Sequence, residues 1–115
     1  EILCSDWSSD VCSSDLAAIS KYTGARGKSG SNDANAEYLG ILRKAFDDAK
    51  VEYQTAELGR IDAGGGGTIA YIPAAYGMDV IDIGVPILNM HAPYEVSSKA
   101  DVYETTKCYK AFYEM

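Results

Sequence analysis

The single histidine of the chain, His91, is the residue whose type and position most suggest chemistry. It follows a hydrophobic stretch, 79–88, that we expect to be a buried strand, and sites in α/β proteins gather beyond strand carboxyl ends. An imidazole there can ligate a metal, act as a general base, or be an ordinary surface histidine. Zinc needs three or four ligands. Glu57, Asp62 and Glu95 are candidate oxygen ligands, although nothing in their spacing requires that role.

A run of four glycines, Gly64–Gly67, precedes Thr68, where a short helix is expected to begin. Unhindered backbone N–H groups at a helix start can bind an anion or a carbonyl oxygen. A tight turn with closely packed backbone is the equally valid alternative. A second glycine-rich segment, 22–31, has a spacing that fits neither the Walker A motif nor the dinucleotide fingerprint, so we interpret it as a solvated loop.

The cysteines offer no catalytic arrangement. Cys108 falls inside a predicted helix and is most simply a packing residue. Cys4 and Cys12 have spacings that fit no zinc ribbon or CxxC motif, so a reduced intracellular setting, the cytoplasm, is the default. The sequence contains no arguable Ser/His/Asp or Cys/His set.

The elements that must position these residues alternate along the chain. The short apolar segment 17–21 fits the end of a buried strand. A helix should begin near Asn32 or Asp33, either of which can cap it. The β-forming residues of 51–58 and the hydrophobic run of 79–88 predict two strands. We expect the second strand to be covered on both faces, with Pro86 at an edge or bulge. Between these two strands we expect a short helix from Thr68 to Tyr76, which Pro73 limits and Gly77 ends. After the second strand we expect a helix whose start resembles a capping box formed by Ser98 and Asp101.

Each of the two long helices should have one apolar face. This pattern of strands and helices predicts an α/β layered domain, with helices covering a mainly parallel or mixed sheet. The residues expected to face the core are Tyr38, Ile41, Leu42, Ala45, Phe46 and Ala49 in the first helix and Val102, Thr106, Tyr109, Phe112 and Tyr113 in the last.

Composition limits the partners. The chain has 115 residues and a net charge of −7, which argues against nucleic acid and anionic membranes because both require a basic patch. Residues 1–16 repeat Ser-Asp and have no helical or strand period, so we expect them to be disordered. The segment DWSSDVCSSDL also resembles translated sequencing-adapter DNA, which favours an artefactual origin and a domain covering residues 17–115.

Three segments carry a resemblance to a known family: SKYTGARGKSGSNDANAEY, TAELGRIDAGGGGTIAY and GMDVIDIGVPILNMHAPYEVSSKADVYET. From about Ala17 onward the chain resembles the C-terminal part of the M18 metalloaminopeptidases, and is most similar to bacterial members. The resemblance implies a layered part of a zinc-exopeptidase (phosphorylase/hydrolase-like) domain. It further implies a two-metal, usually zinc, enzyme that removes N-terminal residues from peptides and assembles as a homo-oligomer when intact.

The resemblance also assigns roles to individual residues. His91 matches a terminal metal ligand, and Gly66, Gly67 and Thr68 match a turn that lines the substrate pocket. Lys21 matches a substrate-contacting lysine, with Lys28 as its rival because the loop varies in length. The family's other metal ligands and its catalytic glutamate have no counterpart in this sequence, so we expect the chain alone to be inactive. The alternatives are a non-catalytic α/β interaction domain and an anion- or phosphate-binding module that uses the Gly64–Thr68 loop.

Overall fold

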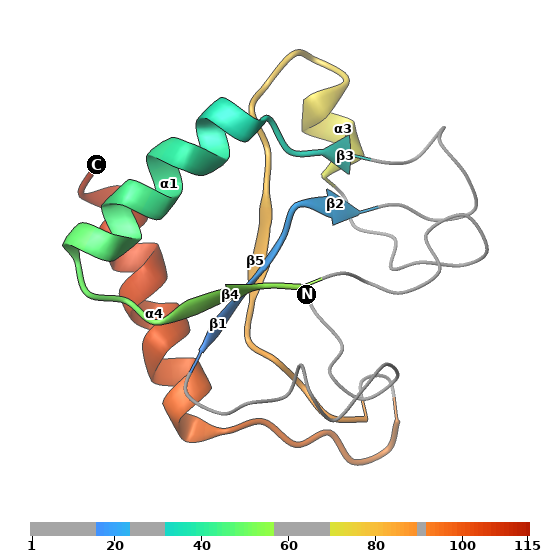
Figure 1. Cartoon of the computed structure of the whole chain (residues 1–115). Helices are drawn as coiled ribbons and strands as arrows, with labels where there is room; N and C mark the ends of the chain where they lie inside the picture. The colour runs from blue at the N-terminus through green and yellow to red at the C-terminus, as the bar shows by residue number, and fades with distance from the viewer. Residues whose placement is uncertain (1–15, 24–31, 57–69, 90–91) are drawn as a thin grey trace.

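The structure, a computed structural model, describes residues 16–23, 32–56, 70–89 and 92–115. In Figure 1 the strands cross the middle of the molecule, and the two long helices lie together on one side of them. The described elements, in chain order, are β1 (Ala17–Ser20), β2 (Tyr22–Thr23), β3 (Asn32–Asp33), α1 (Ala36–Asp48), β4 (Tyr53–Thr55), α3 (Tyr71–Ala74), β5 (Asp82–Gly84) and α4 (Lys99–Tyr113).

The main sheet has three strands in the order β4-β1-β5. The central strand β1 runs parallel to β4, with Ala17 opposite Tyr53, and antiparallel to β5, with Ile19 opposite Ile83. The sheet is therefore mixed, which confirms the α/β class with a mixed sheet. A separate two-stranded ladder joins β2 to β3 in antiparallel register.

The core lies between β1 and the two long helices. All four residues of β1 are buried, and alternate residues of a strand point to opposite faces. Ala17 and Ile19 pack in one cluster with Leu42 and Phe46 of α1 and with Cys108 of α4. Small alanines in β1 allow the helices to lie close to the sheet, so the apolar residues of three elements form one core.

The start of the first helix differs from the expectation. Asn32 and Asp33 do not cap it, because they form β3 and pair with Tyr22–Thr23. The cap is instead Asn35, whose side-chain oxygen accepts a hydrogen bond from the backbone N–H of Glu37 at 2.9 Å. The predicted apolar face holds at Leu42 and Phe46, both fully buried, whereas Ile41 is 57% exposed.

The predicted inward stripe of the last helix was wrong by one residue. Since one residue turns an α-helix by about 100°, this shift presents a different face to the core. Small side chains on that face let α4 lie against β1, and the Asp101 carboxylate accepts a hydrogen bond from the backbone N–H of Leu16 at 2.9 Å. The residues of α4 that are buried are Asp101, Thr105, Cys108 and Ala111, whereas Val102, Thr106, Tyr109, Phe112 and Tyr113 are exposed.

The strand predicted over 79–88 is shorter than expected. Only Asp82–Gly84 pair with β1, and Ile83 is half-buried rather than covered on both faces. Pro86 lies buried just after the strand. The short helix predicted from Thr68 to Tyr76 is present as a single turn, Tyr71–Ala74, and its predicted start at Thr68 lies outside the described residues. Gly77 has the left-handed φ of 78° expected after a helix end.

Candidate functional site

Lys21 directly follows β1, at the carboxyl end of the central strand. Its ammonium forms an ion pair with the carboxylate of Asp33 in β3, and its carbonyl accepts a hydrogen bond from the N–H of Ala34 at 2.8 Å. The two charged side chains are 40% and 60% exposed, so both remain accessible to solvent. Lys21 is therefore held by the β2–β3 ladder and stays within reach of a ligand.

The chain leaves β4 at the same edge of the sheet, because β4 is parallel to β1. The N–H of Ala56 donates to the carbonyl of Ile19 at 2.8 Å, which fixes this exit point. The segment that follows, 57–69, contains Glu57, Asp62, Gly66, Gly67 and Thr68 and lies outside the described residues, as does Lys28 in 24–31.

The carboxyl end of β5 lies at the opposite end of the strands from Lys21, because β5 is antiparallel to β1. Figure 1 shows this trace running from the α3 end of the molecule past the sheet and away from β2 and β3. The structure therefore separates Lys21 from the strand end that leads toward His91.

Described residues on the two sides of position 91 are hydrogen-bonded to each other. Leu88 and Val96 form an antiparallel bridge, with N···O distances of 2.8 and 3.1 Å in the two directions. Asn89 has a left-handed φ of 57°, and its carbonyl accepts the N–H of Ala92 at 3.0 Å. His91 itself lies outside the described residues. The bridge and this hydrogen bond fix where the chain enters and leaves the segment that carries His91.

The described part of the chain does not fit a metal centre by itself. Across residues 16–23, 32–56, 70–89 and 92–115 no three His, Cys, Asp or Glu side chains form a group that could hold a metal ion. Glu95, one of the candidate oxygen ligands, is exposed on the loop after position 91. A complete site would therefore need donors beyond these residues.

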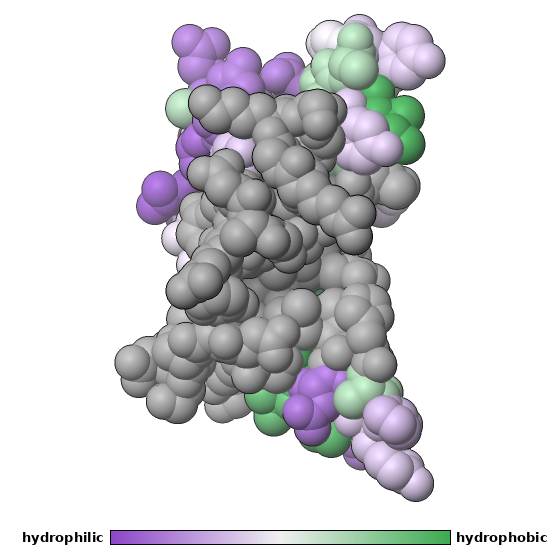
Figure 2. All heavy atoms as spheres, turned by 90° about the vertical axis from the view of Figure 1, so that its right-hand side faces the viewer, coloured by the Kyte–Doolittle hydropathy of each residue, from purple (hydrophilic) through white to green (hydrophobic). Residues whose placement is uncertain are grey.

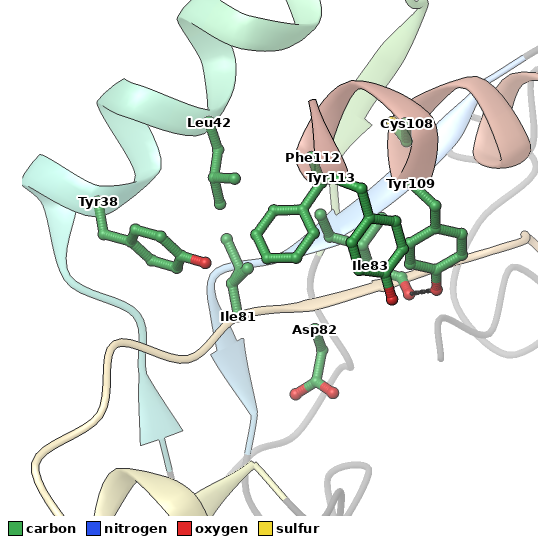
Figure 3. Close-up of a pocket in the computed structure, with 9 residues that line it drawn as sticks. All are labelled: Tyr38, Leu42, Ile81, Asp82, Ile83, Cys108, Tyr109, Phe112 and Tyr113. Atoms are coloured by element: carbon green, nitrogen blue, oxygen red, sulfur yellow. Dashed lines mark hydrogen bonds between the residues drawn. The ribbon is translucent and has the colours of Figure 1, made fainter. Parts of the chain in front are cut away.

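A cleft of about 300 Å³ opens where α1, β5 and α4 meet, and sequence reasoning did not find it. In Figure 3 the rings of Phe112, Tyr109 and Tyr113 lie over β5, while the Asp82 carboxylate points away from them. The Tyr109 hydroxyl donates to the carbonyl of Ile83 at 2.8 Å. The lining residues are Tyr38, Leu42, Ile81, Asp82, Ile83, Cys108, Tyr109, Phe112 and Tyr113.

Two titratable groups that line this cleft, Cys108 and Tyr109, have raised pKa values. Burial raises the pKa of the Cys108 thiol to about 11, with the nearby Glu104 carboxylate adding to the effect. Burial also raises the pKa of Tyr109, and the neighbouring Cys108 and Tyr113 raise it further. Neither group is suited to proton transfer near neutral pH. Cys108 and Tyr109 therefore make the cleft suited to apolar groups, and the Asp82 carboxylate points away from its aromatic rings.

A polar contact holds α4 against the turn between α1 and β4. The Glu104 carboxylate accepts the N–H of Glu52 at 3.1 Å and two contacts from the Lys107 ammonium, at 2.9 and 2.8 Å. Lys107 also donates to the carbonyl of Lys50 at 3.0 Å. The i,i+3 spacing of Glu104 and Lys107 signals an intrahelical pair, but their backbone partners are distant in sequence and gave no signal.

Comparison with known proteins matches this chain to a family. Residues 17–113 match the family described as aminopeptidase I zinc metalloprotease (M18). Over 94 residues the chain is 66% identical to a probable M18 family aminopeptidase 1 of Clostridium acetobutylicum, and over 97 residues it is 52% identical to that of Thermotoga maritima. These matches cover 82% and 84% of this chain.

Solved structures give the same result. The crystal structure of aminopeptidase I from C. acetobutylicum superposes with a TM-score of 0.76 at 63% identity and covers 84% of this chain. That of aminopeptidase I from Borrelia burgdorferi B31 superposes with a TM-score of 0.68 at 32% identity. The chain spans about a fifth of these relatives: 20% of the C. acetobutylicum protein, 22% of the T. maritima protein and 21% of each of the two crystal structures.

Proposed function

The chain belongs to the M18 family of zinc metalloproteases, and we propose that it forms part of the catalytic domain of an aminopeptidase. The observation that carries the proposal is the family match across residues 17–113, together with a TM-score of 0.76 to a solved aminopeptidase I. The proposed substrates are peptides, from which the N-terminal residue is released. In our proposal the domain covers residues 17–115, and Leu16 is joined to it by the hydrogen bond from its N–H to Asp101.

We propose that His91 supplies one ligand of a two-zinc centre. Zinc ions in such a site polarise the scissile carbonyl and lower the pKa of a bound water. In this proposal the other ligands and the general base would come from polypeptide outside this chain, because the family's remaining ligands and its glutamate have no counterpart in the sequence. The isolated chain is accordingly expected to be inactive.

The remaining candidate residues would bind substrate. Backbone N–H groups of Gly66, Gly67 and Thr68 would line the pocket that receives the peptide. Lys21 would contact substrate by exchanging its partner Asp33, which is possible because both side chains are partly exposed. Lys28 is the alternative to Lys21 for this role.

The cellular setting is also part of the proposal. We expect a homo-oligomer in the cytoplasm that binds neither nucleic acid nor membrane, in keeping with the net charge of −7. Among the helices that the structure describes, none combines the length and the hydrophobicity needed to cross a bilayer.

A chimera tests the role of His91. In it, residues 17–115 of this chain replace the matched segment of the C. acetobutylicum relative, and zinc content and release of an N-terminal residue are measured. His91→Ala should lower the zinc content and reduce the rate by about a hundredfold, because loss of a ligand should cost at least as much as the roughly 10- to 100-fold seen for groups that only support a ligand. Glu95→Gln tests the rival oxygen ligand and should change little. Asp48→Asn, at an exposed carboxylate of α1, is the control.

Two outcomes would contradict the assignment of His91 as a ligand. A folded chimera that keeps full zinc content and activity with His91→Ala would remove His91 from the metal centre. Loss of zinc with Glu95→Gln and not with His91→Ala would move the ligand to Glu95.

A further inference from the structure

The cleft between α1, β5 and α4 is bordered by apolar side chains that are only partly covered. Phe112 is 38% exposed and Tyr113 is 81% exposed, and both stand over the half-buried Ile81 and Ile83 in Figure 3. Aromatic side chains contribute strongly to core and interface energetics because each buries a large area. An exposed group of this size beside a sheet edge is typical of a surface that another element covers.

The described sheet has one of its edges at this place. In the order β4-β1-β5 the strand β5 is at one end of the described sheet, and the cleft lies directly beside it. The three described strands of this sheet are about half of the roughly five or six strands that are usual. The relatives are roughly five times as long as the part of them that this chain matches.

Other exposed apolar groups are less informative. Tyr71, Ile72, Tyr76 and Met78 around α3 are exposed as well, and Figure 2 shows green and pale side chains at the upper right, where α3 lies. They line no described cleft, and nothing beside them indicates what covers them.

We propose that the cleft formed by Ile81, Ile83, Phe112 and Tyr113 is an internal seam that binds the remainder of an M18 catalytic domain, with apolar side chains of that polypeptide filling the cleft. The inference rests on the proposed function in taking the chain to be part of such a domain. Raised pKa values keep the Cys108 thiol and the Tyr109 hydroxyl neutral, and the Asp82 carboxylate points away from the aromatic rings, which together suit an apolar occupant. A second copy of this chain is the competing occupant.

The test uses the full chain and the portion of the C. acetobutylicum relative that lies outside the matched segment. The two are expressed separately, mixed, and examined by affinity co-purification and titration. Phe112→Glu and Tyr113→Glu should each weaken association by about tenfold or more, because each places a charge in a buried apolar contact. Ile41→Glu, at an exposed apolar position of α1 that does not line the cleft, should leave association unchanged.

A second measurement guards against variants that fail to fold. Hydrogen exchange of the unmodified chain, with and without the partner polypeptide, should show added protection of the amides of 81–84 and 109–113. Protection only outside these ranges, or equal loss of association with Ile41→Glu, would overturn the seam. Self-association of the chain that Phe112→Glu abolishes, without binding to the partner, would assign the cleft to a second copy. Association through the cleft without peptide hydrolysis would uphold the seam and contradict the proposed function.

Discussion

Glu104 links three parts of the chain through one carboxylate: the backbone at Glu52, the ammonium of Lys107 and, through Lys107, the carbonyl of Lys50. The Lys107 ammonium holds the pKa of Glu104 below its usual value, and the Glu52 N–H lowers it further. A carboxyl whose pKa is lower in the folded state stabilises the fold above its unfolded pKa, and this contribution is lost as the pH falls through the folded pKa.

Glu104→Gln should therefore lower the melting temperature near neutral pH, and the difference from wild type should shrink as the pH falls through the lowered folded-state pKa of Glu104. Thermal melts followed by circular dichroism at neutral pH and at an acid pH provide the measurement. Lys44 and Asp48 form a fully exposed pair on α1, and Asp48→Asn is the control expected to show little effect at either pH. A difference between Glu104→Gln and wild type that grows in acid would contradict the account.

Cys108 should be chemically silent in the folded chain. Its side chain is 1% exposed, and burial raises its pKa to about 11, so the reactive thiolate is scarce at neutral pH. Alkylation with iodoacetamide, mapped by mass spectrometry, should modify Cys108 only slowly until denaturant is added. Rapid modification of Cys108 in native buffer would show that α4 does not pack on β1 as described.

At the scale of elements, two glycines predict opposite responses to the same substitution. Gly40 lies within α1 and Gly77 has a φ of 78°, and a Cβ added at either position meets no atom within 4 Å. Gly40→Ala should stabilise the fold by about 1 kcal/mol through helix propensity. Gly77→Ala should destabilise it by about 1 kcal/mol through left-handed strain alone. Urea denaturation measures both, and the same sign for the two variants would contradict the assigned backbone conformations.

The helix caps provide a further test at this scale. Asn35→Ala removes the side-chain acceptor of the Glu37 N–H and should cost about 1 kcal/mol, whereas Asn35→Ser should retain most of that stability. Ser98→Ala removes the acceptor of the Ala100 N–H in α4 and should cost a similar amount. Urea denaturation that gives equal stability for wild type and Asn35→Ala would show that α1 begins elsewhere.

The sequence predicted the elements whose signals are local and failed where contacts are distant. Periodicity located the two long helices, and Gly77 was identified as a helix end, because both signals lie within a few neighbouring residues. The prediction of Asn32 and Asp33 as caps was wrong because they pair with Thr23 and Tyr22, which are not among their near neighbours in sequence. The buried face of α4 was misplaced because aromatic residues, which ordinarily face a core, here border a cleft.

Much the same holds for the candidate site. Lys21 was located correctly at a strand end, but its partner Asp33 could not be foreseen without the β2–β3 ladder. The antiparallel direction of β5, which sends its carboxyl end to the opposite end of the strands from Lys21, leaves no trace in a hydrophobic run. His91, Gly66, Gly67 and Thr68 lie outside the described residues, and their roles stay predictions.

At the scale of the whole molecule, the chain has the mixed sheet and helices of M18 aminopeptidases over about a fifth of their length. Its described residues form a core between β1, α1 and α4, an apolar cleft beside β5, and no set of three metal donors. We infer that the chain forms part of the fold of a larger catalytic domain and supplies a small number of its site residues.

The most direct measurement is the initial rate of release of an N-terminal residue from a peptide in the presence of zinc, for the isolated chain and for the chimera that carries residues 17–115. The account predicts turnover by the chimera at a rate near that of the C. acetobutylicum relative, and none by the isolated chain. Turnover by the isolated chain, or a folded, zinc-loaded chimera without activity, would contradict it.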